Sequence, residues 1–396
     1  MLSSIQLSHL DSRKIIDLGN NEKAWIIGTI YCEMKLKPNI LNELVHNTHS
    51  SQVDSNLMKF TNEDDIYVVE DESARIELSG EILKNEKLVT GVTCGLFGFQ
   101  DEDGKFNVSD ISFPKLQPQS NISCSDIWVA LISGLNLGNP SSMNIKLQLL
   151  IDYLDGELGT HDDQQENCNL TRVVFAGNTL SKPKFVEHDL EEKKTKRFGN
   201  DYTPLDTSPI KTLDSYLKQL STSMSVDIMP GINDPTTTTL PQQPINTGLF
   251  PKSSPYETFN TVTNPYMFEL EGVSFLGTSG QNIDDIFRCS NMIDRLEICE
   301  KTLLWGHICP TAPDTLWCYP FKDDDPFILK QKPHVYFVGN QPSFETRVVE
   351  DELGSKTRII LVPSFDETKT FVLLNCNTLE CKSITILDEI EEKIER

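Results

Sequence analysis

Short runs of apolar and β-branched residues, separated by glycine or aspartate turns, dominate the first third of the chain. These runs lie at residues 25–31, 64–82, 87–100 and 104–113. Runs of this length with turn residues between them are typical of a small antiparallel barrel. The pattern therefore predicts an all-β domain over residues 20–124, preceded by a lead segment at residues 1–19.

From residue 125 onward, strand-like runs alternate with helical patterns. The helical patterns lie at residues 144–156, 212–221 and 293–305, and most of the strand-like runs end at a glycine turn. This alternation predicts an α/β domain over residues 125–396, and in such folds the strand ends carry the chemistry.

Two segments interrupt this alternation. Residues 230–256 contain six prolines and cannot form a regular helix or a central strand, so we expect an ordered loop that wraps the surface. Further along, Asn282 or Asp284 is expected to cap a helix that begins near Ile286.

The chain is strongly acidic. Its 396 residues include 59 Asp or Glu and 35 Lys or Arg, for a net charge of −24, which disfavours a protein that holds nucleic acid through its own field. Ten cysteines without C-x-x-C spacing predict buried free thiols, and neither a disulfide framework nor a zinc ribbon.

No apolar run is long enough to span a bilayer and no signal peptide is recognised, so we expect a cytosolic or nuclear protein with no membrane partner. The cluster at Lys193, Lys194, Lys196 and Arg197 fits a nuclear localisation patch and a solvated loop equally well.

Five strand-end loops carry the argument about chemistry. They lie at residues 132–138, 173–181, 229–235, 306–310 and 335–344. Their order and strand-then-glycine context resemble the calcineurin-like metallophosphoesterases, whose loops carry Asp, His and Asn ligands for two metal ions. The resemblance implies that the former ligand positions in this chain are Gly134, Asn136, Asn178, Ser181, Ile232, Asn233, His307, Asn340 and Pro342.

Only His307 and the neighbouring Asp234 keep the character of good metal ligands in these loops. Two isolated ligands do not hold a binuclear centre, so the resemblance implies a degenerate site with no metal, no cofactor and no catalysis. One alternative stays open: a surviving metallophosphoesterase or nuclease that uses His307 and Asp234 with an unconventional ligand set.

A narrower resemblance covers nearly the whole chain. The segments VDIMPGINDP, HICPTAPDTLWCYPF and HVYFVGNQPSF closely resemble the small (B) subunit family of DNA polymerase delta. The resemblance implies an α/β plus β fold, with an N-terminal OB barrel packed on an inactivated calcineurin-like phosphoesterase β-sandwich flanked by helices. The barrel would occupy residues 20–124 and the phosphoesterase domain residues 125–396.

The same resemblance implies a nuclear, non-catalytic scaffold in DNA replication and repair. Its expected partners are the C-terminal domain of the catalytic subunit and a third adaptor subunit, with an indirect link to the sliding clamp and DNA. The resemblance also allows a translesion polymerase catalytic subunit as a further partner.

An OB barrel could alternatively bind single-stranded DNA through a basic groove with stacking aromatics. Residues 22–115 contain 9 basic and 17 acidic side chains, so the barrel is a poor electrostatic match for that role. Its aromatic residues lie in apolar strand runs and are expected in the core. Candidates for a protein interface come from the proline-rich loop and the segment after it, namely Leu240, Gln242, Gln243, Asn282, Asp284 and Asp285.

Overall fold

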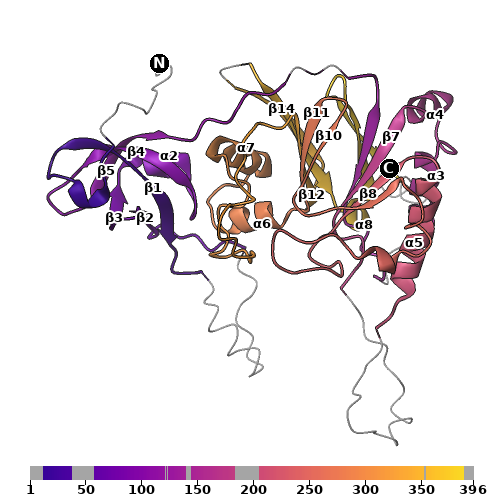
Figure 1. Cartoon of the computed structure of the whole chain (residues 1–396), viewed down its shortest axis with the longest axis horizontal. Coiled ribbons are helices and arrows are strands. Elements are labelled where there is room, and N and C mark those ends of the chain that lie inside the picture. The colour runs from indigo at the N-terminus through magenta and orange to yellow at the C-terminus, as the bar shows by residue number, and fades with distance from the viewer. Residues whose placement is uncertain are drawn as a thin grey trace, which may run out of the picture. The chain divides into compact units, whose positions relative to one another are not determined.

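The computed structural model describes residues 12–37, 58–120, 122, 124–139, 144–182, 205–351 and 354–387. The basic cluster at residues 193–197 lies outside these described residues, as does part of the lead segment. The chain divides into two compact units (Figure 1). The barrel unit contains residues up to 118 together with 282–332, and the sandwich unit contains 119–281 and the residues from 333 onward. The sequence assigns residues 282–332 to the second domain, whereas their contacts group them with the barrel.

The barrel unit is built on five strands that close into a barrel in the order β1-β2-β3-β5-β4. All neighbours are antiparallel except β3 and β5, which pair in parallel through Leu78 and Phe106. The predicted barrel is therefore confirmed, although one strand pair is parallel and a short helix lies between β3 and β4. Its elements are η2 (Ile15–Asp17), β1 (Lys23–Glu33), β2 (Ile66–Glu70), β3 (Arg75–Ser79), α2 (Glu81–Glu86), β4 (Thr93–Gln100) and β5 (Phe106–Ser112).

Strand β1 shows why this sequence closes into a barrel. Ile26, Ile30 and Cys32 are buried, whereas Ile27 and Thr29 between them are exposed. Successive side chains of a strand point to opposite faces, so this alternation places one set of residues in the barrel interior and the other in solvent.

Residues 282–332 belong to the barrel unit because polar and apolar contacts join them to it. This segment includes α7 (Arg295–Trp305) and all but the first residue of α6 (Gln281–Arg288). Lys87 and Lys301 pair with Glu297 and Glu86 at 2.7 Å, so the C-terminal end of α2 is joined to α7. Cys289 packs into an apolar cluster with Cys32 and Met34 at the end of β1.

The two helices begin at different signals. Helix α6 begins at Gln281, so the expectation that Asn282 or Asp284 caps a helix starting near Ile286 is wrong. Helix α7 begins after Asp294, whose Oδ1 accepts a hydrogen bond from the Leu296 N–H at 2.8 Å. That contact satisfies one of the unpaired N–H groups of the first turn.

The sandwich unit contains two sheets. A five-stranded sheet runs in the order β10-β11-β12-β14-β13, and a six-stranded sheet runs β16-β15-β6-β7-β8-β9. The strands are β6 (Trp128–Ile132), β7 (Leu170–Ala176), β8 (Ser225–Met229), β9 (Phe259–Thr261), β10 (Tyr266–Leu270), β11 (Val273–Thr278), β12 (Val335–Gln341), β13 (Glu345–Glu350), β14 (Lys356–Pro363), β15 (Thr370–Asn375) and β16 (Cys381–Thr385). The helices of this unit are α3 (Asn144–Leu154), α4 (His161–Asn167), α5 (Ser208–Ser221), η4 (Thr247–Leu249) and α8 (Phe365–Thr368).

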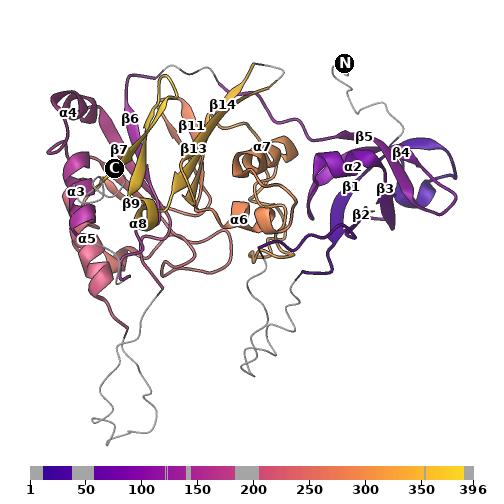
Figure 2. The ribbon, with the colours of Figure 1, turned by 180° about the vertical axis from the view of Figure 1, so that it is seen from behind.

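The two sheets pack face to face, and helices cover the outer face of the larger one. One apolar cluster joins Leu131 and Val174 of the six-stranded sheet to Phe275 and Phe337 of the other. A second cluster joins the opposite face of the six-stranded sheet to α3 and α5, which lie beside β7 and β8 in both views (Figures 1 and 2). Strands buried on both faces need near-continuous apolar runs, as in the fully buried β6, WVALI. The α/β class predicted for this region is confirmed.

The proline-rich segment at residues 230–256 is ordered but only partly superficial. Its one regular element is the short η4 helix, in agreement with the prediction. Leu240, Ile245 and Phe250 are buried. The apolar residues between the prolines thus pack into the core, because the irregular backbone allows them to turn inward.

All ten cysteines are free, and six of them are buried, as predicted. Burial raises the pKa of the Cys32, Cys94, Cys289 and Cys376 thiols to about 12. Thiols in this state are poor nucleophiles and poor metal ligands, so they act as small apolar residues. Among the described residues, no helix is long and apolar enough to cross a membrane.

Candidate functional site

Four of the five predicted loops come together in the sandwich unit. The loops after β6, β7 and β8 and the end of β12 meet at one edge, where three parallel strands of one sheet finish beside a strand of the other. Backbone hydrogen bonds join the first two loops, from Gly134 N to Gly177 O and from Asn136 N to Asn178 O, each at 3.0 Å. The structure therefore brings the former ligand positions of these loops into one place.

The backbone explains why asparagine and glycine occupy these loops. Asn136, Asn178 and Asn340 have φ values of 46°, 53° and 57°, and Gly134 has φ 63°. Glycine and asparagine adopt this left-handed region most readily. The sharp turns at the strand ends thus account for glycine and asparagine at these positions through backbone conformation alone.

Gly134, which we expect at the position of the first Asp ligand, has little room for a side chain. A Cβ atom there would lie 2.4 Å from Ser364 Oγ and 2.9 Å from Asn340 Oδ1. Real Cβ atoms essentially never make contacts that close. A side chain at this position would require Ser364 and Asn340 to shift.

The side-chain amides of Asn340 and Asn178 form hydrogen bonds within the protein. Asn340 Nδ2 donates to Ser279 O at 2.8 Å and to Ala176 O at 3.3 Å, and its backbone N–H donates to Ser133 Oγ at 2.9 Å. Asn178 Oδ1 accepts from the backbone N–H of Asn233 at 3.1 Å. Both side chains join separate loops through hydrogen bonds.

Asp234 is the one carboxylate in this group, and it is also occupied. It is buried and accepts from the N–H groups of Leu180 at 2.9 Å and Gly231 at 2.8 Å, and from Thr179 Oγ1 at 2.8 Å. Burial raises the pKa of Asp234 above its ordinary value, and these donors oppose the rise because they favour the ionised form. The carboxylate holds the loop after β7 against the loop after β8.

His307, the other ligand retained in the sequence, belongs to the barrel unit. Its Nδ1 accepts from the backbone N–H of Cys309 at 3.2 Å, so Nε2 carries the proton and donates to Asp325 Oδ2 at 3.0 Å. Both ring nitrogens are used within that unit, and Asp234 is bonded within the other.

The remaining former ligand positions offer little to a metal ion. Pro342 and Ile232 are exposed, and Ser181 and Asn233 are half-buried. In the part of the chain that the structure describes, no three His, Cys, Asp or Glu side chains gather as a metal site requires. The residues present therefore do not fit a binuclear centre.

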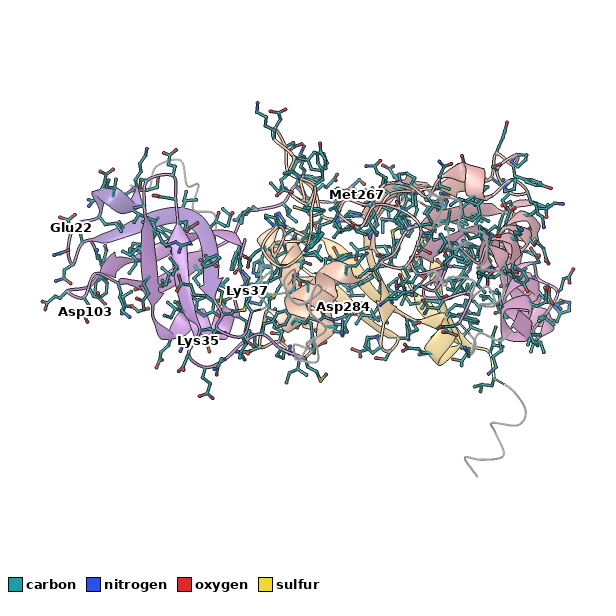
Figure 3. The ribbon with its side chains drawn as sticks, turned by 90° about the horizontal axis from the view of Figure 1, so that it is seen from below. Glu22, Lys35, Lys37, Asp103, Met267 and Asp284 are labelled. Carbon is teal, nitrogen blue, oxygen red and sulfur yellow. The ribbon has the colours of Figure 1, made fainter. Side chains whose placement is uncertain are left out.

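The predicted interface residues divide into buried and accessible ones. Leu240, Gln242, Asn282 and Asp285 are buried. Gln242 shows the reason, because its Nε2 donates to Gly231 O and Thr237 O while its Oε1 accepts from Asn264 at 2.8 Å. Gln243 is exposed and Asp284 is half-buried on α6 (Figure 3), so only these two present side chains to solvent.

The barrel carries a shallow cavity of about 600 Å³. Its lining includes Arg13 and Lys14, but also Glu70, Asp71 and Glu72. Arg13 pairs with Glu22, and Lys14 pairs with Glu72 at 2.5 Å. These carboxylates neutralise the cations that a phosphate backbone would need, so the cavity does not favour single-stranded DNA.

Two features of the barrel unit were missed by sequence reasoning. The first is Lys59, whose Nζ donates to the carbonyls of Phe287, Ser290 and Met292 at the end of α6 and just beyond it. The second is the run LWCYPF at residues 316–321, whose three aromatic side chains are exposed. Three aromatics among proline and aspartate residues were the available signal, since a core strand rarely carries that composition.

Comparison with known proteins identifies the chain's relatives. The sequence matches the family described as the B subunit of DNA polymerase alpha/epsilon over residues 129–346 and the DNA polymerase delta subunit OB-fold domain over residues 4–111. It is 40% identical to the DNA polymerase delta small subunit of Arabidopsis thaliana, covering 97% of this chain and 87% of the relative. The small subunit from Saccharomyces cerevisiae is 37% identical, over 95% of this chain and 82% of that protein. DNA polymerase delta subunit 2 of Drosophila melanogaster is 36% identical, over 92% and 84%.

These matches span both units, and the OB-fold match covers the strands of the closed barrel as far as Ile111 of β5. The chain therefore belongs to the family of DNA polymerase delta small subunits, accessory chains that are not themselves catalytic.

Proposed function

We propose that this chain is a scaffold of DNA polymerase delta in DNA replication and repair. It binds the C-terminal domain of the catalytic subunit and holds a third adaptor subunit, which links the assembly to the sliding clamp and DNA. It acts in the nucleus, and the same surfaces serve the catalytic subunit of a translesion polymerase.

The observation that carries this proposal is the filling of the strand-end site. Gly134 has no space for a ligand, and Asn178, Asn340 and Asp234 are committed to loop-to-loop hydrogen bonds. A scaffold needs complementary surface and a rigid frame, and these bonds supply rigidity where a phosphoesterase would need free ligands. We take the sandwich unit to be a calcineurin-like phosphoesterase domain that has lost its metal site.

Parts of the proposed partner surface follow from exposure. Gln243 and Asp284 are the two predicted interface residues whose side chains reach solvent. Asp284 pairs with Arg295 on the neighbouring helix, so a partner would meet a preformed ion pair there.

The test is a mild affinity purification of the tagged full-length chain from its own cells, followed by mass analysis. We expect a large polymerase catalytic subunit and a smaller adaptor in near-equal amounts. Recovery of the lone chain would overturn the proposal.

A second measurement separates the scaffold from an enzyme. The purified chain is assayed for phosphodiester hydrolysis with added manganese, beside a His307→Ala variant. Hydrolysis that is lost in the variant would contradict the scaffold proposal and favour a nuclease.

A further inference from the structure

The barrel unit exposes a concentrated aromatic surface on one loop. Trp317, Tyr319 and Phe321 are 60%, 59% and 50% exposed, and they lie within five residues of each other. We call residues 316–322 the aromatic loop. Single exposed apolar residues are ordinary on protein surfaces, as Ile293 and Met267 show here, but a group of large aromatics is not.

Both ends of the segment that carries this loop are fixed to the unit. On the N-terminal side, Thr315 Oγ1 donates to the buried Asp285 at 2.6 Å, and Asp314 pairs with Lys37 of the barrel. On the C-terminal side, Phe327 is buried and its carbonyl accepts from the Ile308 N–H at 3.0 Å. The exposed aromatics therefore stand on a defined frame.

The aromatic side chains also support one another. The rings of Tyr319 and Phe321 meet edge to face, with centroids 5.0 Å apart, and the Phe321 N–H donates to Tyr319 O at 3.0 Å. Because the two rings are held in contact, a partner would not have to order them on binding. Such preorganisation lowers the entropy cost of association, and Trp and Tyr are frequent energetic centres of interfaces.

The charge beside the loop selects the chemistry of the partner. Asp323, Asp324 and Asp325 follow the aromatic loop directly, and all three are exposed. Asp325 accepts from His307, and Asp324 meets Lys330 only at 3.8 Å in an exposed pair. Residues 322–330 thus contain three aspartates against Lys322 and Lys330, so their net charge is −1 and the local field stays negative.

We propose that the aromatic loop and the three aspartates that follow it form a docking surface for an arginine-bearing segment of a partner polypeptide. The guanidinium group stacks on exposed aromatic faces and also pairs with carboxylates, so one residue type satisfies both halves of this surface. Phosphate backbones are repelled by the aspartates, and a second copy of this chain carries the same net charge of −24. This inference rests on the proposed scaffold function and names one of its contact surfaces.

The test uses the full-length chain and a fluorescein-labelled peptide, (Arg-Leu-Arg-Pro)₃, with (Glu-Leu-Glu-Pro)₃ as the charge control. The variant W317A/Y319A/F321A is expected to weaken binding of the arginine peptide at least fivefold, measured by fluorescence anisotropy. Ile293→Ala, which removes an exposed apolar side chain of the same unit, should leave the affinity unchanged.

Charge is tested separately with Asp323→Lys, expected to weaken the arginine peptide at least threefold. Asp103→Lys, in the turn between β4 and β5 (Figure 3), makes the same charge change elsewhere on the barrel unit and should have little effect. Equal affinity of the triple variant and the unaltered chain would overturn the inference. So would equal binding of the glutamate peptide, or equally tight binding of a labelled 20-nucleotide oligothymidylate measured without the arginine peptide.

Affinity purification distinguishes this inference from the scaffold proposal. If the unaltered chain recovers polymerase subunits and the triple variant recovers less, both stand. If both chains recover them equally, the docking inference fails and the scaffold proposal stands. If the unaltered chain recovers none, the scaffold proposal itself fails.

Discussion

Two loop regions of this protein differ in where their side chains point. The strand-end loops of the sandwich unit turn polar groups inward, where Asn340 and Asp234 bind backbone groups of neighbouring loops. The aromatic loop of the barrel unit turns Trp317, Tyr319 and Phe321 outward. Buried polar groups with satisfied hydrogen bonds indicate a structural role, whereas exposed aromatic side chains leave apolar surface in water that a partner could bury. The comparison therefore assigns a structural role to the strand-end loops and a binding role to the aromatic loop.

The largest expected effect concerns the tight contact at Gly134. Gly134→Ala should lower the free energy of unfolding by about 2–5 kcal/mol, from left-handed strain and overpacking together. The added Cβ would meet Ser364 Oγ at 2.4 Å. Urea denaturation of the full-length chain measures the loss.

Gly156 supplies the matched control for that substitution. It has a similar φ of 78°, but nothing lies within 4 Å of the position that a Cβ atom would take there, so Gly156→Ala should cost only about 1–2 kcal/mol. Equal losses at the two positions would show that the surroundings of Gly134 can relax to admit a Cβ atom.

A somewhat smaller effect is expected at Asp234. Asp234→Asn replaces a carboxylate oxygen by an NH₂ group that faces N–H donors, and it should cost about 2–4 kcal/mol. Asp103→Asn at an exposed turn should change stability by less than about 0.5 kcal/mol. If Asp234→Asn proves neutral in the same denaturation measurement, the carboxylate does not hold these loops together.

Lys59, which donates to three backbone carbonyls at and beyond the end of α6 in the barrel unit, predicts a pH dependence of stability. Burial, with Arg295 nearby, lowers the pKa of Lys59 from 10.5 to about 8. Between these values the unfolded chain binds the proton that the folded chain has released, so the stability contributed by Lys59 rises with pH. Relative to Lys59→Met, the unaltered chain should gain roughly 1 kcal/mol from pH 7.5 to 9.5, a value reduced for solvent screening.

Three backbone carbonyls and the Phe287 ring, 3.4 Å from Lys59 Nζ, oppose this shift because they favour the ammonium form. Urea denaturation of the unaltered chain and of Lys59→Met at pH 7.5 and 9.5 shows whether desolvation or these contacts dominate the pKa of Lys59. A constant stability difference would mean that these contacts offset the desolvation of the ammonium.

The smallest expected effect on stability belongs to the aromatic loop. The W317A/Y319A/F321A variant should unfold within about 0.5 kcal/mol of the unaltered chain, because these side chains are exposed. Phe327→Ala, at the buried end of the same segment, should cost about 3–5 kcal/mol. A large loss in the triple variant would make the loop part of the core and remove the contrast between the two regions.

The hydrophobic patterns of individual segments predicted much of the fold. The alternation of β1 and the continuous apolar run of β6 record how many faces of each strand are buried, so strand type could be read directly. Helix α7 was recognisable from its length and its apolar spacing. Helix α6 was placed too late, since it begins at Gln281.

For the candidate site, the sequence predicted which positions carry no metal-ligand side chain, but it did not predict the contacts that the residues there make. The absence of ligands at Gly134 and Pro342 could be read from residue identity alone. That Asn178 and Asn340 bind other loops could not, because their partners are far away in the sequence. Gln242 was mistaken for surface for the same reason, since its partner Asn264 comes from another segment.

By itself, the sequence determined the barrel, the α/β alternation, the strand-end glycines and the absence of charged side chains at Gly134 and Pro342, because each depends on local spacing or residue chemistry. Only the tertiary structure decided that residues 282–332 join the barrel and that His307 and Asp234 belong to different units. It also decided that three aromatics of one loop remain outside the core. Burial and partnership are properties of contacts between distant segments, and periodicity along one segment does not encode them.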